Sequence, residues 1–225
     1  MPLNLSKIGK VLKTLNRFEG IKEFNASLPV KIEVKKEINP IKFLINLGNR
    51  EIETKSYIPL KVGKKYFAQI KEGKYSIKIS NLKEYPKILE ILKKIDFTKE
   101  ILTPDKKEIM THLTNANSKT EFIFWMNVLM AFNQNIYHLI INEKKKALMQ
   151  LKYKKNSIKF YAVFEHLGEI EGILFHKNLK LFCEFASTIN LINFYKNELP
   201  FIVEVNKKEI TEIYQFSENL INLKV

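Results

Sequence analysis

Cysteine, glycine and arginine are all scarce in this 225-residue chain, and each shortage excludes a class of protein. A single cysteine, Cys183, rules out an intramolecular disulfide framework and a cysteine-rich zinc module, and is typical of a reducing compartment. Seven glycines leave little material for a phosphate-binding loop, and no common nucleotide-binding, serine-hydrolase or metalloprotease motif is present. The sequence therefore predicts a protein that is not an enzyme and uses no cofactor, no metal and no small-molecule substrate.

The histidines, which remain as candidates for catalysis or metal binding, are isolated from one another in the sequence. They are His112, His138, His166 and His176. His166 lies beside Glu165 and Glu169, a combination that would suit a general base or half of a metal site. We expect His166 to cap a turn instead, because residues 165–168 have the composition of a corner between two strands.

Long apolar runs are also missing. The longest apolar stretch, residues 122–132, is shorter than the roughly 20 residues that a membrane-spanning helix needs. Residues 1–13 alternate apolar residues with lysines and lack the unbroken apolar centre of a secretory signal. The sequence therefore predicts a cytoplasmic protein without a stable membrane span, and leaves export without a cleavable signal open.

Lysine is abundant where arginine is scarce. The formal net charge is +14, and the 38 basic residues include only two arginines, Arg17 and Arg50. Arginine supplies the bidentate fork that phosphates and base edges favour, so its scarcity argues against selection for nucleic-acid contact. Residues 165–225 are mildly acidic, which places the positive charge in the preceding part of the chain. An anionic partner would therefore meet the N-terminal region.

The first two predicted units are a helix over residues 1–20 and a small β domain over residues 21–84. Apolar residues recur every three or four positions from Leu5 to Phe18, which predicts an amphipathic helix that either packs on its own protein, lies on a membrane or binds a partner. From Leu28 to Ser80 the period changes to two, and Gly48-Asn49 and Glu72-Gly73 are turn signals. This pattern predicts a small barrel or rolled sheet of about five strands.

A helical connector is predicted over residues 85–133. Pro86 can lie in the first turn of one helix, Thr103-Pro104-Asp105 opens a second, and Ser118 with Glu121 forms the pattern of a capping box at the start of a third. The third helix is apolar nearly all round, so it must be enclosed by other elements or by a partner.

Residues 134–225 form the last predicted unit, in which three alternating runs between Ile158 and Phe185 indicate an antiparallel meander. One face of each run is apolar. The other face carries Lys159, Glu165, Glu171, Lys180 and Glu184, which favours a sheet that is covered on one side only. The expected class is α+β, with an N-terminal barrel or rolled sheet, a helical connector and a C-terminal antiparallel sheet packed by a helix at about 187–199.

This last unit resembles the C-terminal domain of bacterial flagellar hook-length control proteins, over roughly residues 126–214. The resemblance rests on a strand, the step Leu-Gly-Glu-Ile-Glu-Gly, two further strands and a helix. The matching positions are Phe164, Leu167, Gly168, Glu169, Ile170, Leu174, Leu179, Leu181 and Phe185. The N-terminal β unit is similar, more loosely, to a segment that precedes this domain in some relatives, whereas the long flexible ruler region typical of the family is missing.

The resemblance implies a regulatory binding function. Hook-length control proteins act at the flagellar type III export apparatus, where the C-terminal domain contacts the export switch protein and changes the exported substrate class from hook to filament. It also implies association with this apparatus or export through it. By the same resemblance, the candidate contact surface is an exposed face formed by Leu167, Gly168, Glu169, Glu171 and Ser187.

A nucleic-acid-binding protein is the alternative interpretation. An oligonucleotide-binding barrel would show the same strand pattern in residues 21–84, and its basic groove would need stacked aromatic side chains. The candidates for that role are Phe43, Tyr57, Tyr66, Phe67 and Tyr75. Aromatic residues in strands more often belong to a core.

Overall fold

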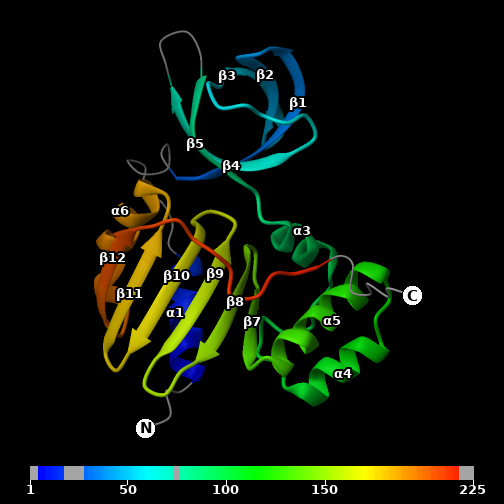
Figure 1. The fold of residues 1–225 in the computed structure, drawn as a ribbon, viewed down its shortest axis with the longest axis vertical. Helices are drawn as coiled ribbons and strands as arrows, with labels where there is room; N and C mark the ends of the chain where they lie inside the picture. Colours follow the sequence, from blue (N-terminus) through cyan, green and yellow to red (C-terminus); the bar gives the residue numbers. More distant parts are fainter. Residues whose placement is uncertain (1–4, 18–27, 73–76, 218–225) are drawn as a thin grey trace.

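The computed structural model describes residues 5–17, 28–72 and 77–217, and it has the mixed α+β class that the sequence predicts. A five-stranded barrel lies at one end of the molecule, and a seven-stranded sheet flanked by helices makes up the rest (Figure 1). The chain begins with helix α1 (Leu5–Arg17), which packs on the sheet, then forms the barrel and returns to build the sheet. The N-terminal helix and the C-terminal strands therefore share one core.

The barrel is formed by β1 (Val30–Asn39), β2 (Lys42–Leu47), β3 (Arg50–Lys55), β4 (Lys65–Glu72) and β5 (Ile77–Glu84). The strand order β1-β2-β3-β5-β4 closes on itself because β1 pairs with both β2 and β4. Neighbouring strands are antiparallel except β3 and β5, which meet in parallel over a short contact. Alternate residues such as Ile32, Val34 and Phe43 fill the interior, joined by Leu60 of the β3–β4 loop.

Helices α3 (Lys87–Lys94), α4 (Lys106–Thr114) and α5 (Lys119–Asn133) follow the barrel, as the sequence predicts. The full capping box lies at α4, where Asp105 and Glu108 each accept the other's backbone N–H. At α5 only half of the predicted box forms. Ser118 accepts the Glu121 N–H at 3.1 Å, but the Glu121 carboxylate accepts the N–H of Asn117.

The sheet has the strand order β12-β11-β10-β9-β8-β7-β6. Its strands are β6 (Ile101–Leu102), β7 (Ile136–Asn142), β8 (Lys146–Tyr153), β9 (Ile158–Phe164), β10 (Gly168–Phe175), β11 (Asn178–Cys183) and β12 (Ile202–Lys207). The predicted meander is confirmed, because β9, β10 and β11 pair in antiparallel register. Helix α6 (Ala186–Tyr195) and the 3-10 turn η1 (Lys196–Glu198) then lead to β12, which runs parallel to β11.

Both faces of the sheet are covered, so the expectation of one uncovered face is wrong. Helix α1 packs on one face through buried Ile8, Val11, Leu12 and Leu15. Of the three alternatives for this amphipathic helix, the structure therefore shows the one in which it packs on its own protein. Helices α3 and α5 and the C-terminal tail, defined here as residues 208–217, cover the other face (Figure 1).

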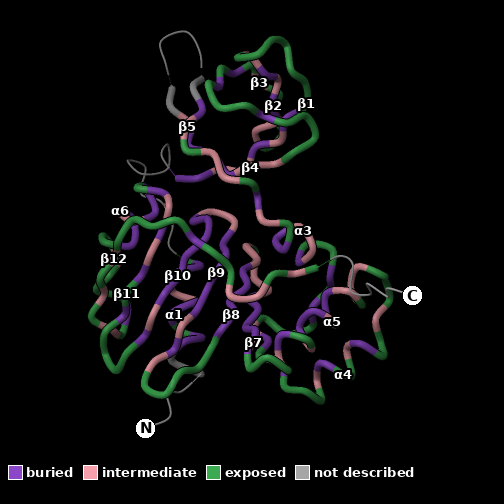
Figure 2. Tube along the Cα trace, viewed as in Figure 1, coloured by how far each residue is buried: buried purple, intermediate pink, exposed green. Residues whose placement is uncertain are grey.

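The central strands explain this double cover, because their side chains are apolar on both faces. Leu139 and Met149 belong to the core that contains α1, whereas Ile140 and Leu148 belong to the core that contains α5. Strands buried on both sides carry continuous rather than alternating apolar residues. Figure 2 shows the consequence as buried backbone trace along most of β8 and β9.

Candidate functional site at the junction of barrel and sheet

The residues predicted to contact a partner lie where the barrel meets the sheet, and all of them are buried. Leu167, Gly168 and Glu169 form the corner between β9 and β10, Glu171 follows on β10, and Ser187 lies in the first turn of α6. The most exposed side chain among them, that of Glu169, retains only 7% of its accessible surface. The expectation that they form an exposed face is therefore wrong, because the protein's own barrel, tail and core cover them.

The barrel is fastened to this corner by a hydrogen bond and a ring contact. The Gln69 amide of β4 donates to the Ser187 hydroxyl at 2.7 Å and accepts a hydrogen bond from Asn81 of β5. The rings of Phe67 and Phe185 meet edge to face, with 6.3 Å between their centroids. The start of α6 is therefore engaged by the barrel.

Gly168 allows the chain to turn in the narrow space beneath the barrel. Its φ of +77° lies in the region that favours glycine, as expected for a corner between strands. A Cβ atom at this position would lie 3.0 Å from a ring carbon of Phe185 and 3.8 Å from Pro29. The corner thus needs glycine both for its backbone angle and for its close approach to Phe185.

A cluster of charged groups joins the barrel to the same corner. Lys83 of β5 lies 2.8 Å from carboxylate oxygens of both Glu169 and Glu184, and it donates to the Ile210 carbonyl of the tail at 3.1 Å. Burial lowers the pKa of Lys83, but its hydrogen bonds to the two glutamates outweigh this effect and raise it overall. The Tyr161 hydroxyl donates to Glu169 at 2.6 Å. The cluster therefore links the barrel, the sheet and the tail through shared ion pairs and hydrogen bonds.

Glu171 is paired in the same way on the neighbouring part of β10. Its carboxylate lies 3.2 Å from the Lys208 ammonium of the tail and 3.3 Å from that of Lys159. Lys208 also lies over the ring of Phe182, 5.2 Å from its centroid. Glu169 and Glu171 therefore each form ion pairs with lysine.

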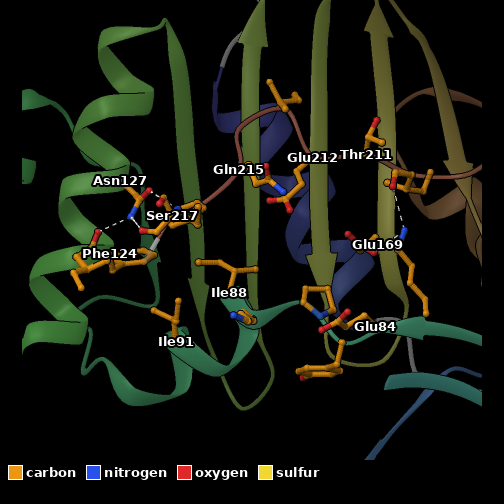
Figure 3. Close-up of a pocket in the computed structure, with 18 residues that line it drawn as sticks. Glu84, Ile88, Ile91, Phe124, Asn127, Glu169, Thr211, Glu212, Gln215 and Ser217 are labelled. Carbon is orange, nitrogen blue, oxygen red and sulfur yellow. Dashed lines mark hydrogen bonds and ion pairs between the residues drawn. The ribbon is translucent and has the colours of Figure 1, made fainter. Parts of the chain in front are cut away.

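A cavity of about 940 Å³ opens beside this cluster, between the end of β5, α3, α5 and the tail. Figure 3 shows Glu212 and Gln215 of the tail on one side and Ile88 of α3 on the other, with Glu169 at the sheet. Partial burial raises the pKa of Glu212 to about 7, and the charge of Glu169 adds to the effect. The cavity therefore combines apolar side chains with both glutamate and lysine side chains.

Two buried amides hold the tail that forms one wall of this cavity. The Gln150 side chain accepts the N–H groups of Ile213 and Tyr214, at 3.0 and 2.9 Å, and donates to the Tyr214 carbonyl. Asn127 of α5 donates to the Ser217 carbonyl and accepts its N–H, both at 2.9 Å. Neither Gln150 nor Asn127 was predicted from the sequence, although a lone amide within an apolar strand or helix signals a buried polar contact.

The titratable side chains considered earlier for chemistry are dispersed. Burial lowers the pKa of His138 to about 3 and raises the pKa of the Cys183 thiol to about 12, so both stay uncharged at neutral pH. His112 stacks on Trp125 at 4.1 Å, and His176 occupies a turn with a φ of +53°. Within residues 5–17, 28–72 and 77–217, no three histidine, cysteine or acidic side chains gather in a way that could hold a metal ion.

The aromatic residues that the sequence offers for nucleic-acid stacking differ in how far they are exposed. Phe43 and Phe67 are buried, Tyr66 is half-buried, and Tyr57 is exposed. Tyr75 lies outside the described residues. Core packing therefore accounts for Phe43 and Phe67.

Among the helices of the described part of the chain, none has the length and apolar character to cross a bilayer. Comparisons with family models, with curated proteins and with solved structures find no match for this chain.

Proposed function

We propose that this chain is a non-enzymatic regulatory protein of the hook-length control type, which binds the export switch protein of the flagellar type III apparatus and changes its substrate specificity. The observation that supports this function is the succession β9, β10, β11 and α6, because it has the order of elements on which the resemblance rests. The partner contact is made by the C-terminal sheet unit.

The contact residues require a particular arrangement in this chain. Glu169 and Ser187 are bound by Lys83 and Gln69 of the barrel, so a partner that uses them must compete with the barrel. A buried polar group that loses one partner costs about 1–3 kcal/mol if it stays unsatisfied, and a new partner that supplies a hydrogen bond removes this cost. The barrel therefore acts as a cover that the export switch protein displaces.

The direct test mixes the purified full chain with the purified cytoplasmic domain of the export switch protein from the same organism and measures heat of binding. In a Gln69→Ala background, where the barrel no longer uses the Ser187 hydroxyl, Ser187→Ala removes a hydroxyl at the proposed contact and is expected to weaken binding about three- to tenfold, the range for one neutral hydrogen bond. Thr98→Ala, at a residue that lines a small pocket beside α4 and makes none of the junction contacts, is the control. Binding that is absent in the wild-type protein would contradict the function, whereas binding that Ser187→Ala leaves unchanged would contradict only the contact surface.

The second candidate function is nucleic-acid binding by the barrel. The closed order β1-β2-β3-β5-β4 favours it, because a five-stranded Greek-key barrel is the architecture of oligonucleotide-binding domains. The burial of Phe43 and Phe67 argues against it, since stacking needs exposed rings. The test measures how the association constant for a single-stranded oligonucleotide depends on salt concentration. If the barrel binds nucleic acid, this constant should fall by about 0.7 logarithmic units per tenfold increase in salt for each phosphate neutralised.

A further inference from the structure

Exposed apolar side chains gather at one end of the barrel. Tyr57 is 81% exposed, and four aliphatic side chains nearby are between 43% and 55% exposed. These four are Ile38, Ile41, Ile58 and Val62. They come from the end of β1, from the turn between β1 and β2, and from the β3–β4 loop, which runs from Ile41 back along β1 to Val34, and we call this surface the barrel tip. Single exposed apolar residues are ordinary, but a group of five marks an interaction surface.

The loop that carries Tyr57 is held in place by the barrel. The Ser56 N–H donates to the Ile41 carbonyl at 3.0 Å, and the Gly63 N–H donates to the Val34 carbonyl at 2.8 Å. These two hydrogen bonds hold residues 56–63 against β1 and the β1–β2 turn. Between them, Leu60 inserts into the barrel core.

This anchoring explains why the apolar side chains at the tip do not turn inward. Leu60 already occupies the core position, so Ile58 and Val62 on either side of it remain outside. The Ser56 hydroxyl also fixes the local turn, accepting the Ile58 N–H at 3.2 Å and donating to the Ile58 carbonyl at 2.7 Å. The loop therefore presents Tyr57 and Ile58 in a fixed conformation.

Lysines surround these apolar side chains with a surplus of positive charge. Lys42 and Lys64 are paired with Glu53 and Glu84. Exposed Lys36, Lys55 and Lys61 form no salt bridge within the described part of the chain. Glu37 is exposed at the same end and offsets one of them. The tip thus combines aliphatic side chains with unpaired ammonium groups.

We propose that the barrel tip docks on an anionic phospholipid surface, with Tyr57, Ile58 and Ile41 entering the interfacial layer and the lysines contacting lipid phosphates. Burial of aliphatic side chains in that layer favours binding, and each lysine near an anionic surface strengthens binding by about fivefold. Single-stranded nucleic acid fits less well, because base stacking uses aromatic rings and only one of the five apolar side chains is aromatic.

The position of the tip leaves the sheet free when the barrel is docked. β1 starts beside the junction, where Pro29 lies close to Gly168, and runs for ten residues to Asn39. An extended strand rises about 3.3 Å per residue, so the tip lies up to about 30 Å from the junction. In Figure 1 the β1–β2 turn points away from the sheet, and in Figure 2 this end of the barrel is exposed. The proposal does not depend on the export function.

Vesicle flotation of the full chain tests the proposal, using phosphatidylcholine vesicles with and without phosphatidylglycerol. We expect binding only to the anionic vesicles. Lys55→Ala with Lys61→Ala should weaken it about 25-fold, and Tyr57→Ser with Ile58→Ser at least tenfold. The charge-matched control is Lys154→Ala with Lys155→Ala in the β8–β9 turn, and the apolar control is Phe175→Ser at the end of β10. Both controls should bind like the wild-type protein.

Three results would overturn the proposal. Equal losses in the control variants would mean that net charge alone drives binding, and equal binding to neutral vesicles would remove the role of the lysines. Binding of a single-stranded oligonucleotide that requires Tyr57 and Lys55, without vesicle binding, would assign the tip to nucleic acid.

A fluorescent reporter gives independent evidence of insertion. Trp125 is the single tryptophan of the chain and is fully buried, so its emission should not respond to vesicles. Tyr57→Trp places a second indole at the tip, and anionic vesicles should shift its emission to shorter wavelength. Phe175→Trp is the control. An unchanged spectrum for Tyr57→Trp would contradict insertion.

Discussion

Glu169 is surrounded by side chains that come from distant parts of the chain. Tyr161 lies on the neighbouring strand, Lys83 comes from the barrel, and Glu212 lies in the tail. The alternating pattern of β10 predicted that Glu169 shares a face with Glu171, but not that this face is buried. Glu169 can be buried because Tyr161 and Lys83 bind its carboxylate. The contact with Lys83 joins distant parts of the chain, so no local sequence pattern predicts it.

The sequence predicts a corner at Gly168, and a substitution measures how much the positive φ and the close approach to Phe185 each contribute. Gly168→Ala should lower the free energy of unfolding by about 2–4 kcal/mol, combining the cost of a positive φ with the contact to Phe185. Gly63→Ala, with a φ of +81° and open space for a Cβ, should lose only about 1–2 kcal/mol. Urea unfolding compares the two. Equal losses would show that the approach to Phe185 is not tight.

His138 should make stability depend on pH on the acid side. Its pKa is lowered by burial from 6.5 to about 3, so between these values the unfolded chain takes up a proton that the native protein excludes. As far as His138 is concerned, the free energy of unfolding therefore has its full value above pH 6.5 and falls by about 1.4 kcal/mol per pH unit as the pH drops toward 3.

The measurement for His138 is urea unfolding of wild type and His138→Phe at pH 7 and pH 5. The variant should lose about 2 kcal/mol less than the wild type between the two pH values, because phenylalanine takes up no proton. Identical pH profiles for the two proteins would show that His138 is protonated in the native state.

At the level of elements, the strands were predictable and their surroundings were not. The period-two runs gave β9, β10 and β11 correctly, since each alternates or is apolar over a few residues between clear turn signals. Which face is covered depends on where α1 and the tail pack, and α1 precedes the barrel in sequence. The contact between Gln69 and Ser187 spans 118 residues, so no spacing rule could have found it.

The docking of the barrel on the sheet depends on Lys83. Lys83→Met leaves Glu169 and Glu184 without their shared cation in a mostly buried position, and should lower the free energy of unfolding by about 2–3 kcal/mol. Lys99→Met breaks the exposed pair with Glu108 and should cost less than about 1 kcal/mol. Chemical unfolding followed by tryptophan fluorescence distinguishes the two. Equal effects would mean that the junction cluster is no stronger than a surface ion pair.

At the level of the whole molecule, the barrel has two ends with different roles. One end covers the corner of the sheet through Gln69 and Lys83, and the other presents Tyr57 with neighbouring lysines. The resemblance to hook-length control proteins concerns the part of the chain that the barrel covers. In the proposed function, the barrel therefore regulates access to the C-terminal unit.

The affinity of the full chain for the cytoplasmic domain of the export switch protein tests this account most directly, when the wild-type protein is compared with Gln69→Ala combined with Lys83→Met. We expect the wild-type protein to bind, and the double variant to bind at least fivefold more tightly, because its barrel competes less well for the corner. Lys99→Met should bind like the wild type. Absence of binding by both the wild-type protein and the double variant would contradict the account.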